Sequence, residues 1–367
     1  MLSRLTLVSA VVFAAGVAIA TPAVSVFREV GVETGAPRIV EVPYWHVPLG
    51  SLPEPDFGWG MYFDWQRIPE EYRSEAYVRK CLKHMADLGF NTCTFYGDAE
   101  TTKRHMAAAS EVGLLSEQPV LVLGEAPEAT DHWCPEIIGY GPDEPRPEDG
   151  PAVRAAVKRW NALGKRCAAA VKRESLKAAT ALDVWIVNAR GLNADCERDL
   201  RELWMYECRF RGTNYDLHRY WTGLYSFAMH KRHGVKACWT WGYLHDADSM
   251  FRIGREGTWR FDVSGRYEHA IAGPDGPIGS VGLDGMAAGI EDFRVLHALD
   301  ECGGGKGWLD ALVARVPSAF WEGTVAGEVP LTRPNMWDLH DTAEPAIDVA
   351  AEMRTAVRLL LAEKAGY

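Results

Sequence analysis

The sequence predicts an α/β protein whose main part is a (β/α)8 TIM-like barrel, followed by a C-terminal helical appendage. Short apolar or β-branched runs alternate with longer stretches of helical periodicity between residues 57 and 300. There are eight such runs, and eight parallel strands close a barrel of this type. A doubly wound open sheet is the structural alternative. It has less support, because the sequence contains neither a Gly-x-Gly-x-x-Gly turn after the first run nor a phosphate-binding loop.

The eight predicted strands are short and follow one another along the chain. They are Gly60–Phe63, Asn91–Tyr96, Val120–Leu123, Ile137–Tyr140, Val184–Val187, Leu203–Tyr206, Val235–Trp241 and, as the weakest, His269–Ala272. The links from the third to the fourth and from the fifth to the sixth have only about a dozen residues, which is near the minimum for a parallel crossover. We therefore expect the barrel to be irregular at these two places.

Helical patterns occupy most of the intervening stretches. In Glu70–Leu88 the apolar residues recur at helical spacing, and Gly89 suits the end of the helix. The segments Thr101–Val112, Pro151–Val171 and Tyr215–His233 have the same character, and the appendage adds Trp308–Val316 and Ala346–Lys364.

The sequence predicts four segments. Residues 1–20 form a signal peptide, with Arg4 in a short positive region, an apolar stretch to Ile19 and small residues at the cleavage site. Residues 21–56 are an N-terminal stub with one strand-like piece at Arg38–Val42, residues 57–300 are the barrel, and residues 301–367 are helical. The apolar stretch is short for a membrane span, so we expect a secreted or periplasmic protein without stable membrane insertion, with an anchor as the alternative.

Composition excludes some classes of partner. The net charge of −11 and the lack of a basic stripe argue against nucleic acid. The eight cysteines form no pair or Cys/His cluster with metal-ligand spacing, so we predict no metal and no cofactor. Cys93, Cys208 and Cys238 lie in apolar runs and are expected to be buried thiols. Disulfide pairing and oligomeric state remain open.

Asp143 and Glu144 are the candidate catalytic residues. They follow the apolar run Ile137–Tyr140 across a Gly-Pro turn, which in a barrel places them at the C-terminal mouth of a strand. The alternative is that these acids cap the following helix. Neighbouring residues on a regular strand face opposite ways, so both can enter one pocket only where the strand breaks, and Pro142 and Pro145 supply that break.

Two carboxylates so close together oppose joint ionisation, which raises one pKa and suits a general acid. Adjacent Asp and Glu also fit a mechanism in which the 2-acetamido oxygen of the substrate attacks the anomeric carbon. One carboxylate then stabilises the new ring while the other protonates the leaving oxygen.

Other strand ends carry polar or aromatic residues that would meet at the same rim. The candidate substrate-binding residues are Asp64, Tyr140, Asn188, Tyr206, Trp239 and Trp241. Each by itself can be explained as a cap, a solvated loop residue or core. Together they would form an acidic cavity with aromatic walls, which is typical of a protein that binds and cleaves carbohydrate.

The stretch from Leu52 to Leu299 resembles glycoside hydrolase family 123 and the related proteins that share its catalytic barrel. The resemblance rests on Tyr140–Pro145, on Leu203–Tyr206 with Tyr215–Gly234 and Trp239–Trp241, on Gly289–Phe293, and on Leu52–Pro55 as a hinge. It implies a retaining, exo-acting β-N-acetylgalactosaminidase that uses neighbouring-group participation. Glu144 would be the acid/base, Asp143 would stabilise the acetamido group, and Tyr206 and Trp241 match aromatics at the sugar site.

The chain departs from the family pattern in two respects. The β-sandwich that precedes the family's barrel has no counterpart, and Gly282, Asp284 and Ala287 stand where the family has Arg, Glu and Arg. A different sugar or a weakened activity is therefore an alternative, as is a carbohydrate-binding barrel without turnover. A double-displacement glycosidase with Glu207 as nucleophile is a further alternative, although Glu207 is better explained as a residue that faces the helices and pairs with Arg209 or Arg211. A Lys-dependent aldolase is disfavoured because no predicted strand ends in a Lys at the mouth, and a Ser hydrolase because Gly-x-Ser-x-Gly is absent.

Overall fold

The computed structural model describes residues 26–30, 38–42, 52–115, 117–127, 133–172, 175–189, 201–208, 214–244, 269–320, 324–325 and 344–364. The chain divides into two units, Met1–Leu52 and Pro53–Tyr367. In the first unit, strands β1 (Val26–Val30) and β2 (Arg38–Val42) pair as an antiparallel hairpin. The strand predicted at Arg38–Val42 is confirmed. The predicted signal peptide lies outside the described residues.

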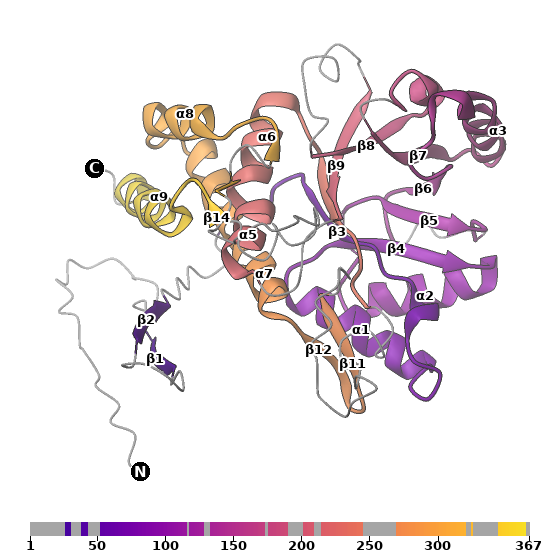
Figure 1. Ribbon diagram of the computed structural model, residues 1–367, viewed down its shortest axis with the longest axis horizontal. Helices are drawn as coiled ribbons and strands as arrows, with labels where there is room; N and C mark the ends of the chain where they lie inside the picture. Colours follow the sequence, from indigo (N-terminus) through magenta and orange to yellow (C-terminus); the bar gives the residue numbers. More distant parts are fainter. Residues whose placement is uncertain are drawn as a thin grey trace, which may run out of the picture. The chain divides into compact units, whose positions relative to one another are not determined.

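The second unit contains a closed barrel of eight parallel strands (Figure 1). In chain order they are β3 (Gly58–Met61), β4 (Thr92–Gly97), β5 (Val120–Gly124), β6 (Ile137–Tyr140), β7 (Arg166–Val171), β8 (Val184–Asn188), β9 (Glu202–Glu207) and β10 (Ala237–Thr240). Strand β10 pairs with β3 and closes the barrel. The predicted (β/α)8 fold is confirmed.

One predicted strand was wrong, and one real strand was missed. The segment His269–Ala272 is not a barrel strand, because β11 (Ala270–Gly273) forms a separate antiparallel hairpin with β12 (Gly276–Gly279). The missing barrel strand is β7, whose residues are predicted as the end of the helical segment Pro151–Val171. Its Ala168-Ala169-Ala170 run has high helix propensity, yet all three side chains are buried in the sheet. The predicted fifth to seventh strands are therefore the sixth to eighth.

Helices follow most strands and cover the barrel. They are α1 (Glu75–Asp87), α2 (Ala99–Glu111), α3 (Gly150–Asn161), α5 (Tyr215–Tyr220), α6 (Ser226–His233) and α7 (Val281–Glu301), with a π-helical segment at Trp221–Tyr225 joining α5 to α6. Short 3-10 turns lie at Trp65–Arg67, Pro147–Asp149 and Ala178–Ala181. The described parts of the β5–β6 and β8–β9 links contain no helix, as expected for an irregular barrel.

The predicted C-terminal helical appendage is present as α8 (Lys306–Arg315) and α9 (Val349–Lys364). Helix α9 contacts α7 and buries Met353, Ala356, Val357 and Leu360. Two further short strands, β13 (Thr324–Val325) and β14 (Glu344–Pro345), pair antiparallel. The Gly303–Gly305 run forms the turn between α7 and α8.

Aromatic side chains fill the barrel, and glycines make room for them. Trp204 and Trp239 stack inside, with ring centroids 5.7 Å apart. Inside the barrel, a Cβ atom on Gly60 would lie 2.5 Å from the Trp239 ring. On the outer face, a Cβ atom on Gly139 would lie 1.8 Å from Trp160 of α3. Large rings therefore pack directly against the backbone of β3 and β6, which leaves no space for a side chain at these two positions.

The segment Gly289–Phe293, which carries part of the family resemblance, holds α7 against α5. A Cβ on Gly289 would lie 2.1 Å from the Thr222 hydroxyl oxygen, so only glycine permits this approach. Asp292 receives two hydrogen bonds from the guanidinium of Arg219, at 2.6 and 2.9 Å, in a buried ion pair. A Cβ on Gly282 would lie 2.8 Å from the His218 ring.

The described cysteines, which are all except Cys196, are free thiols. Cys93 and Cys238 are buried as predicted, and Cys208 is half-buried. Among the helices of the described ranges, none has the length and apolar character needed to span a bilayer. Within the same ranges, no group of three or more His, Cys, Asp or Glu side chains is arranged to hold a metal ion.

Candidate active site

Asp143 and Glu144 lie in the loop that follows β6, and β7 holds this loop in place. The Gly141 N–H donates to the Ala168 carbonyl at 2.7 Å, and the Glu144 N–H donates to the Ala170 carbonyl at 3.0 Å. These two bonds continue the β6–β7 ladder beyond the last residue of β6. The backbone beneath the two carboxylates is therefore tied to the barrel rather than to the helix that follows.

Glu144 has an unusual backbone conformation. Its φ is 44°, and it is the one non-glycine residue with positive φ among those the structure describes. A β-carbon makes this left-handed region costly by about 1–2 kcal/mol. Such strain persists where surrounding contacts impose it, and it is concentrated at functional sites. The conformation explains how two successive side chains both reach partners on the inner side of the barrel.

Asp143 is held by a buried tyrosine. The Tyr140 hydroxyl donates to Asp143 Oδ1 at 2.5 Å and accepts the Ala170 N–H at 3.2 Å. Burial raises the pKa of Asp143, and the charge of Glu144 adds to this. The Tyr140 hydrogen bond and the Lys172 charge oppose the rise without cancelling it. The raised pKa therefore lies on Asp143, whereas the family resemblance assigns the acid role to Glu144.

Glu144 has a different environment from that of Asp143. The Tyr206 hydroxyl donates to Glu144 Oε1, and the Lys172 ammonium pairs with Glu144 Oε2. The side chains of Lys172 and Glu144 are 45% and 29% exposed, so solvent reaches this ion pair. Burial and the hydrogen bond to Glu144 raise the pKa of Tyr206, while a hydrogen bond with Asn188 lowers it. Tyr206 therefore remains a protonated donor at neutral pH.

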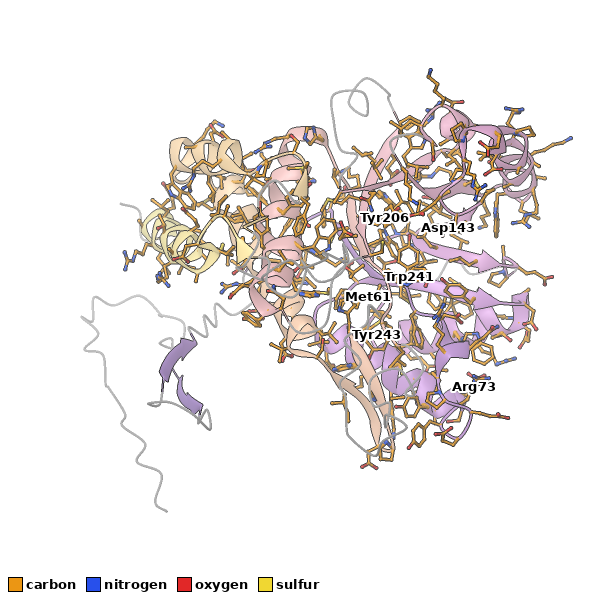
Figure 2. All side chains as sticks on the ribbon, viewed as in Figure 1. Met61, Arg73, Asp143, Tyr206, Trp241 and Tyr243 are labelled. Atoms are coloured by element: carbon orange, nitrogen blue, oxygen red, sulfur yellow. The ribbon has the colours of Figure 1, made fainter. Side chains whose placement is uncertain are left out.

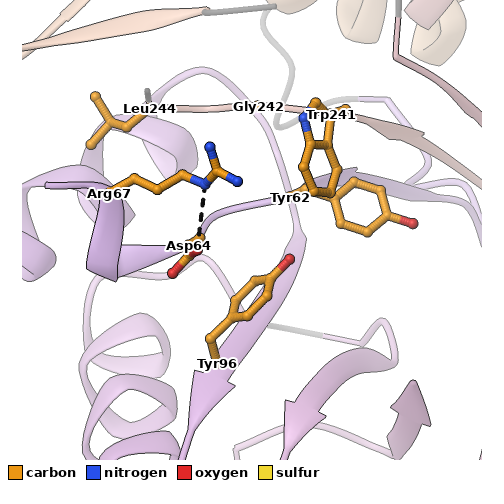
Figure 3. Close-up of a pocket in the computed structure, with 7 residues that line it drawn as sticks. All are labelled: Tyr62, Asp64, Arg67, Tyr96, Trp241, Gly242 and Leu244. Carbon is orange, nitrogen blue, oxygen red and sulfur yellow. Dashed lines mark ion pairs between the residues drawn. The ribbon is translucent and has the colours of Figure 1, made fainter. Parts of the chain in front are cut away.

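A small pocket lies at the ends of β3, β4 and β10 (Figure 3). It is lined by Tyr62, Asp64, Arg67, Tyr96, Trp241, Gly242 and Leu244 and encloses about 220 Å³, including space open to solvent. The rings of Tyr62 and Trp241 lie 5.2 Å apart and form one wall. Asp64 accepts the Gln66 N–H at 3.0 Å and pairs with Arg67 at 3.4 Å, and the Arg67 guanidinium lies 5.8 Å from the Trp241 ring centroid.

The structure brings most of the predicted site residues to the same end of the barrel. Asp143, Tyr206 and Trp241, which belong to or follow three different strands, are labelled in Figure 2. Tyr140, Tyr206 and Asn188 support the two carboxylates, whereas Asp64 and Trp241 line the neighbouring pocket. Neither carboxylate acts as a cap of α3, for which no side-chain cap is found.

Trp239 is a correction to the predicted substrate-binding set. Its side chain is 0% exposed, stacks on Trp204 and lies beneath Tyr62, whose ring centroid is 5.5 Å away. Trp239 and Trp241 both face inward because they are two residues apart on one strand, but Trp239 lies one layer deeper. It is a core residue.

Four further residues at this end of the barrel are not among the predicted site residues. Tyr62, Tyr96 and Arg67 line the pocket, and Lys172 pairs with Glu144. The alternation of inward positions along the first two strands could have indicated Tyr62 and Tyr96. The sequence does not indicate Lys172, because the residues of β7 are predicted to be the end of a helix. Lys172 directly follows β7, so one barrel strand does end in a Lys at the mouth, contrary to the prediction.

Glu207 does not join the pair. It lies on β9, the third strand along the sheet from β6, and its side chain is fully buried. Its Oε1 accepts the Cys208 N–H at 2.9 Å. Because its neighbours Tyr206 and Cys208 pack in the barrel interior, alternation directs Glu207 toward the helices. Arg209 and Arg211, its predicted partners, lie outside the described residues.

Comparisons with known proteins do not assign a family. No family model matches the chain, and no curated protein matches it. Solved structures similar to this chain include a thiamine phosphate pyrophosphorylase from Pyrococcus furiosus, with 13% identity, a TM-score of 0.33, and coverage of 67% of this chain and 96% of that one.

Two other solved structures are also similar to this chain. An active-site mutant of Rhizomucor miehei β-1,3-glucanosyltransferase in complex with laminaritriose has 10% identity and a TM-score of 0.35, covering 62% of this chain and 98% of that one. A xylose isomerase-like TIM barrel/4-hydroxyphenylpyruvate dioxygenase fusion protein has 8% identity and a TM-score of 0.31, covering 67% and 43%. Similarities this low carry no argument about function, so the function has to be argued from the site itself.

Proposed function

We propose that the protein is an exo-acting glycoside hydrolase that releases terminal β-linked N-acetylgalactosamine, or a related N-acetylhexosamine, with retention of configuration. In the first step the acetamido oxygen of the substrate attacks C1 and the C1–O bond to the leaving group breaks. Glu144 gives its proton to the leaving oxygen, and Asp143 binds the acetamido N–H and stabilises the positive ring. In the second step water attacks C1, the ring opens, and the Glu144 carboxylate takes the proton from water.

The observation that carries this proposal is that two adjacent carboxylates have different environments. Asp143 is more buried and is held by Tyr140, whereas Glu144 is more exposed and is held by Tyr206 and Lys172. Two titratable groups in different environments are the usual basis for a division of roles in acid–base catalysis. The residue roles themselves follow from the family resemblance.

The neighbouring pocket supports a sugar as the ligand. Tyr62 and Trp241 present ring surfaces beside a carboxylate and a guanidinium, Asp64 and Arg67. Sugar rings have apolar faces that pack on aromatic rings and hydroxyl edges that bind charged or polar groups.

Hydrolysis of 4-nitrophenyl β-N-acetylgalactosaminide and β-N-acetylglucosaminide tests the proposal. We expect wild-type turnover with the β-anomer as first product in NMR, and a loss of about 10²–10⁴-fold in kcat/KM for Glu144→Gln and Asp143→Asn. Glu125→Gln is the matched control, because Glu125 is an exposed acid after β5 whose carboxylate accepts the Ala99 N–H at 3.4 Å. Full activity in Glu144→Gln, or an inverted product, would contradict the proposal.

A carbohydrate-binding barrel without turnover is the second candidate. The contacts of Glu144 favour it, because both carboxylate oxygens already have partners, Oε1 the Tyr206 hydroxyl and Oε2 the Lys172 ammonium. Binding of N-acetylgalactosamine in calorimetry by both the wild type and Glu144→Gln, with no turnover by either, would establish this alternative.

Two other mechanisms receive less support. A double-displacement glycosidase would need Glu207 within about 5–5.5 Å of its partner, at the mouth. Its burial and outward position argue against this, so we expect Glu207→Gln to keep catalytic activity. A Schiff-base aldolase would need a neutral Lys172 amine, whereas pairing with Glu144 favours the ammonium.

We also propose export of the protein, with cleavage after the small residues that end at Ala20. N-terminal sequencing of the product from the periplasm or medium of an expressing bacterium tests this. Recovery of the intact Met1 terminus from the cytoplasm alone would contradict it.

A further inference from the structure

We propose that Tyr140 is a positioning residue that orients Asp143, so that Asp143 Oδ2 is the oxygen that binds the acetamido N–H of the ligand. This inference rests on the proposed function. In the part of the chain that the structure describes, the other carboxylate oxygens of the pair have partners. These partners are the Tyr140 hydroxyl for Asp143 Oδ1, the Tyr206 hydroxyl for Glu144 Oε1 and the Lys172 ammonium for Glu144 Oε2. Within the same residues Asp143 Oδ2 has none, so it is the oxygen that is open to a ligand.

The Tyr140 side chain is itself fixed on both faces of the sheet. Its ring lies in the barrel interior and meets the Tyr62 ring edge to face, with centroids 6.3 Å apart. On the outer face, the indole N–H of Trp160 donates to the Tyr140 carbonyl at 3.3 Å. A ring that is locked by packing holds a neighbouring carboxylate more precisely than a loop residue does.

The Tyr140 hydroxyl connects Asp143 to strand β7. Its oxygen accepts the Ala170 N–H at 3.2 Å, and its single hydrogen is donated to Asp143 Oδ1 at 2.5 Å. Burial raises the pKa of Tyr140 well above its ordinary value, so the hydroxyl keeps this hydrogen. The Ala170 carbonyl accepts the Glu144 N–H at 3.0 Å. One residue of β7 therefore sets the side chain of Asp143 through Tyr140 and the backbone of Glu144 directly.

The consequence for the reaction is that Asp143 is oriented before the ligand binds. Its free oxygen has to receive the acetamido N–H while the acetamido oxygen attacks C1. The N–H gains positive charge as the new ring forms, so its bond to Oδ2 is stronger in the transition state than in the ground state. Without the Tyr140 hydroxyl the carboxylate is free to turn, and this gain is lost. The loss therefore falls on kcat rather than on KM.

The first test is Tyr140→Phe, which removes the hydroxyl and keeps the ring. We expect kcat on 4-nitrophenyl β-N-acetylgalactosaminide to fall about 10–100-fold, the usual effect of losing a hydrogen bond to a charged group, with KM nearly unchanged. Tyr77→Phe is the matched control, because Tyr77 is a buried tyrosine of α1 whose hydroxyl donates to the Gly273 carbonyl at 2.8 Å. An equal fall in the control, or a rise in KM without a fall in kcat, would overturn the inference.

A second test shows whether Tyr140 acts through Asp143. If it does, Tyr140→Phe removes nothing further once the carboxylate is gone, so the double variant with Asp143→Ala should be as active as Asp143→Ala alone. A role in folding alone would lower the activity of both backgrounds by the same factor. Losses that multiply in the double variant would therefore count against positioning.

Crystal structures of the wild type and Tyr140→Phe make the test independent of turnover. We expect the Asp143 carboxylate to change its orientation in the variant, while Glu144 keeps its hydrogen bond with Tyr206. If the wild type hydrolyses nothing but Asp143 turns in the variant, the proposed function fails and the positioning role of Tyr140 stands. An Asp143 carboxylate that keeps its orientation in the variant overturns that role even in an active enzyme.

Discussion

At the scale of single residues, the site depends on a short break in a strand. The Gly-Pro turn before Asp143 and the proline after Glu144 end the regular strand, so two successive side chains can serve one site. The sequence indicated this break and both carboxylates. It did not indicate which hydroxyls hold them, because Tyr140 lies three residues from Asp143 while Tyr206 lies 62 residues from Glu144.

The left-handed backbone at Glu144 leads to a stability prediction. Glycine ordinarily destabilises an ordered position relative to alanine, but it adopts positive φ without steric cost. We expect Glu144→Gly to be more stable than Glu144→Ala by about 1 kcal/mol in urea unfolding. Both variants lack the carboxylate, so the comparison isolates the backbone. An alanine variant as stable as the glycine variant would show that φ at this residue relaxes to negative values.

The raised pKa of Asp143 leads to a prediction about pH. A carboxyl whose pKa is higher in the folded than in the unfolded state stabilises the fold fully below its unfolded pKa of about 3.9, and this contribution is lost as pH rises through the folded value. Asp143→Asn, which imitates the protonated form, should therefore unfold at higher urea concentration than the wild type at pH 7. The difference in urea midpoint between the variant and the wild type should become smaller toward pH 4. A wild type that is more stable than the variant at pH 7 would contradict the raised pKa of Asp143.

At the scale of elements, strand β7 shows where sequence patterns fail. Local propensity favoured a helix through the alanine run, but the barrel requires small side chains there because Tyr140 and the tryptophans occupy its interior. Helix α7 shows the opposite case. Its segment Gly289–Phe293 packs against α5 and the π-helical segment.

The Arg219–Asp292 pair leads to a prediction at this scale. Both side chains are 8% exposed, so removing one partner leaves an uncompensated buried charge. We expect Arg219→Met and Asp292→Leu to cost about 3–5 kcal/mol each in the free energy of unfolding. The double variant should cost clearly less than the sum, which a double-mutant cycle in guanidinium chloride measures. Additive losses would mean that the two charges do not depend on each other.

At the scale of the whole molecule, the chain divides before Pro53, and the barrel unit contains its own C-terminal helices. We expect a chain that begins at Pro53 to melt at the same temperature as the full chain. Deletion of residues 348–367 removes α9, which buries five apolar side chains, and should lower the melting temperature by about 10 °C or more. Calorimetry measures both. A large loss on deletion of residues 1–52 would show that the barrel needs the first unit.

The sequence by itself determined the class of fold, seven of the eight barrel strands and the carboxylate pair. These features are local: apolar runs, a strand broken by prolines, and polar residues at strand ends that parallel topology brings to one rim. Only the tertiary structure decided that β7 completes the barrel, that Trp239 lies in the core, and that Tyr206 and Lys172 meet Glu144. These features depend on how deep a residue lies in the barrel and on contacts between residues distant in the chain. Hydrophobic periodicity and local propensity contain no information about depth or about such contacts.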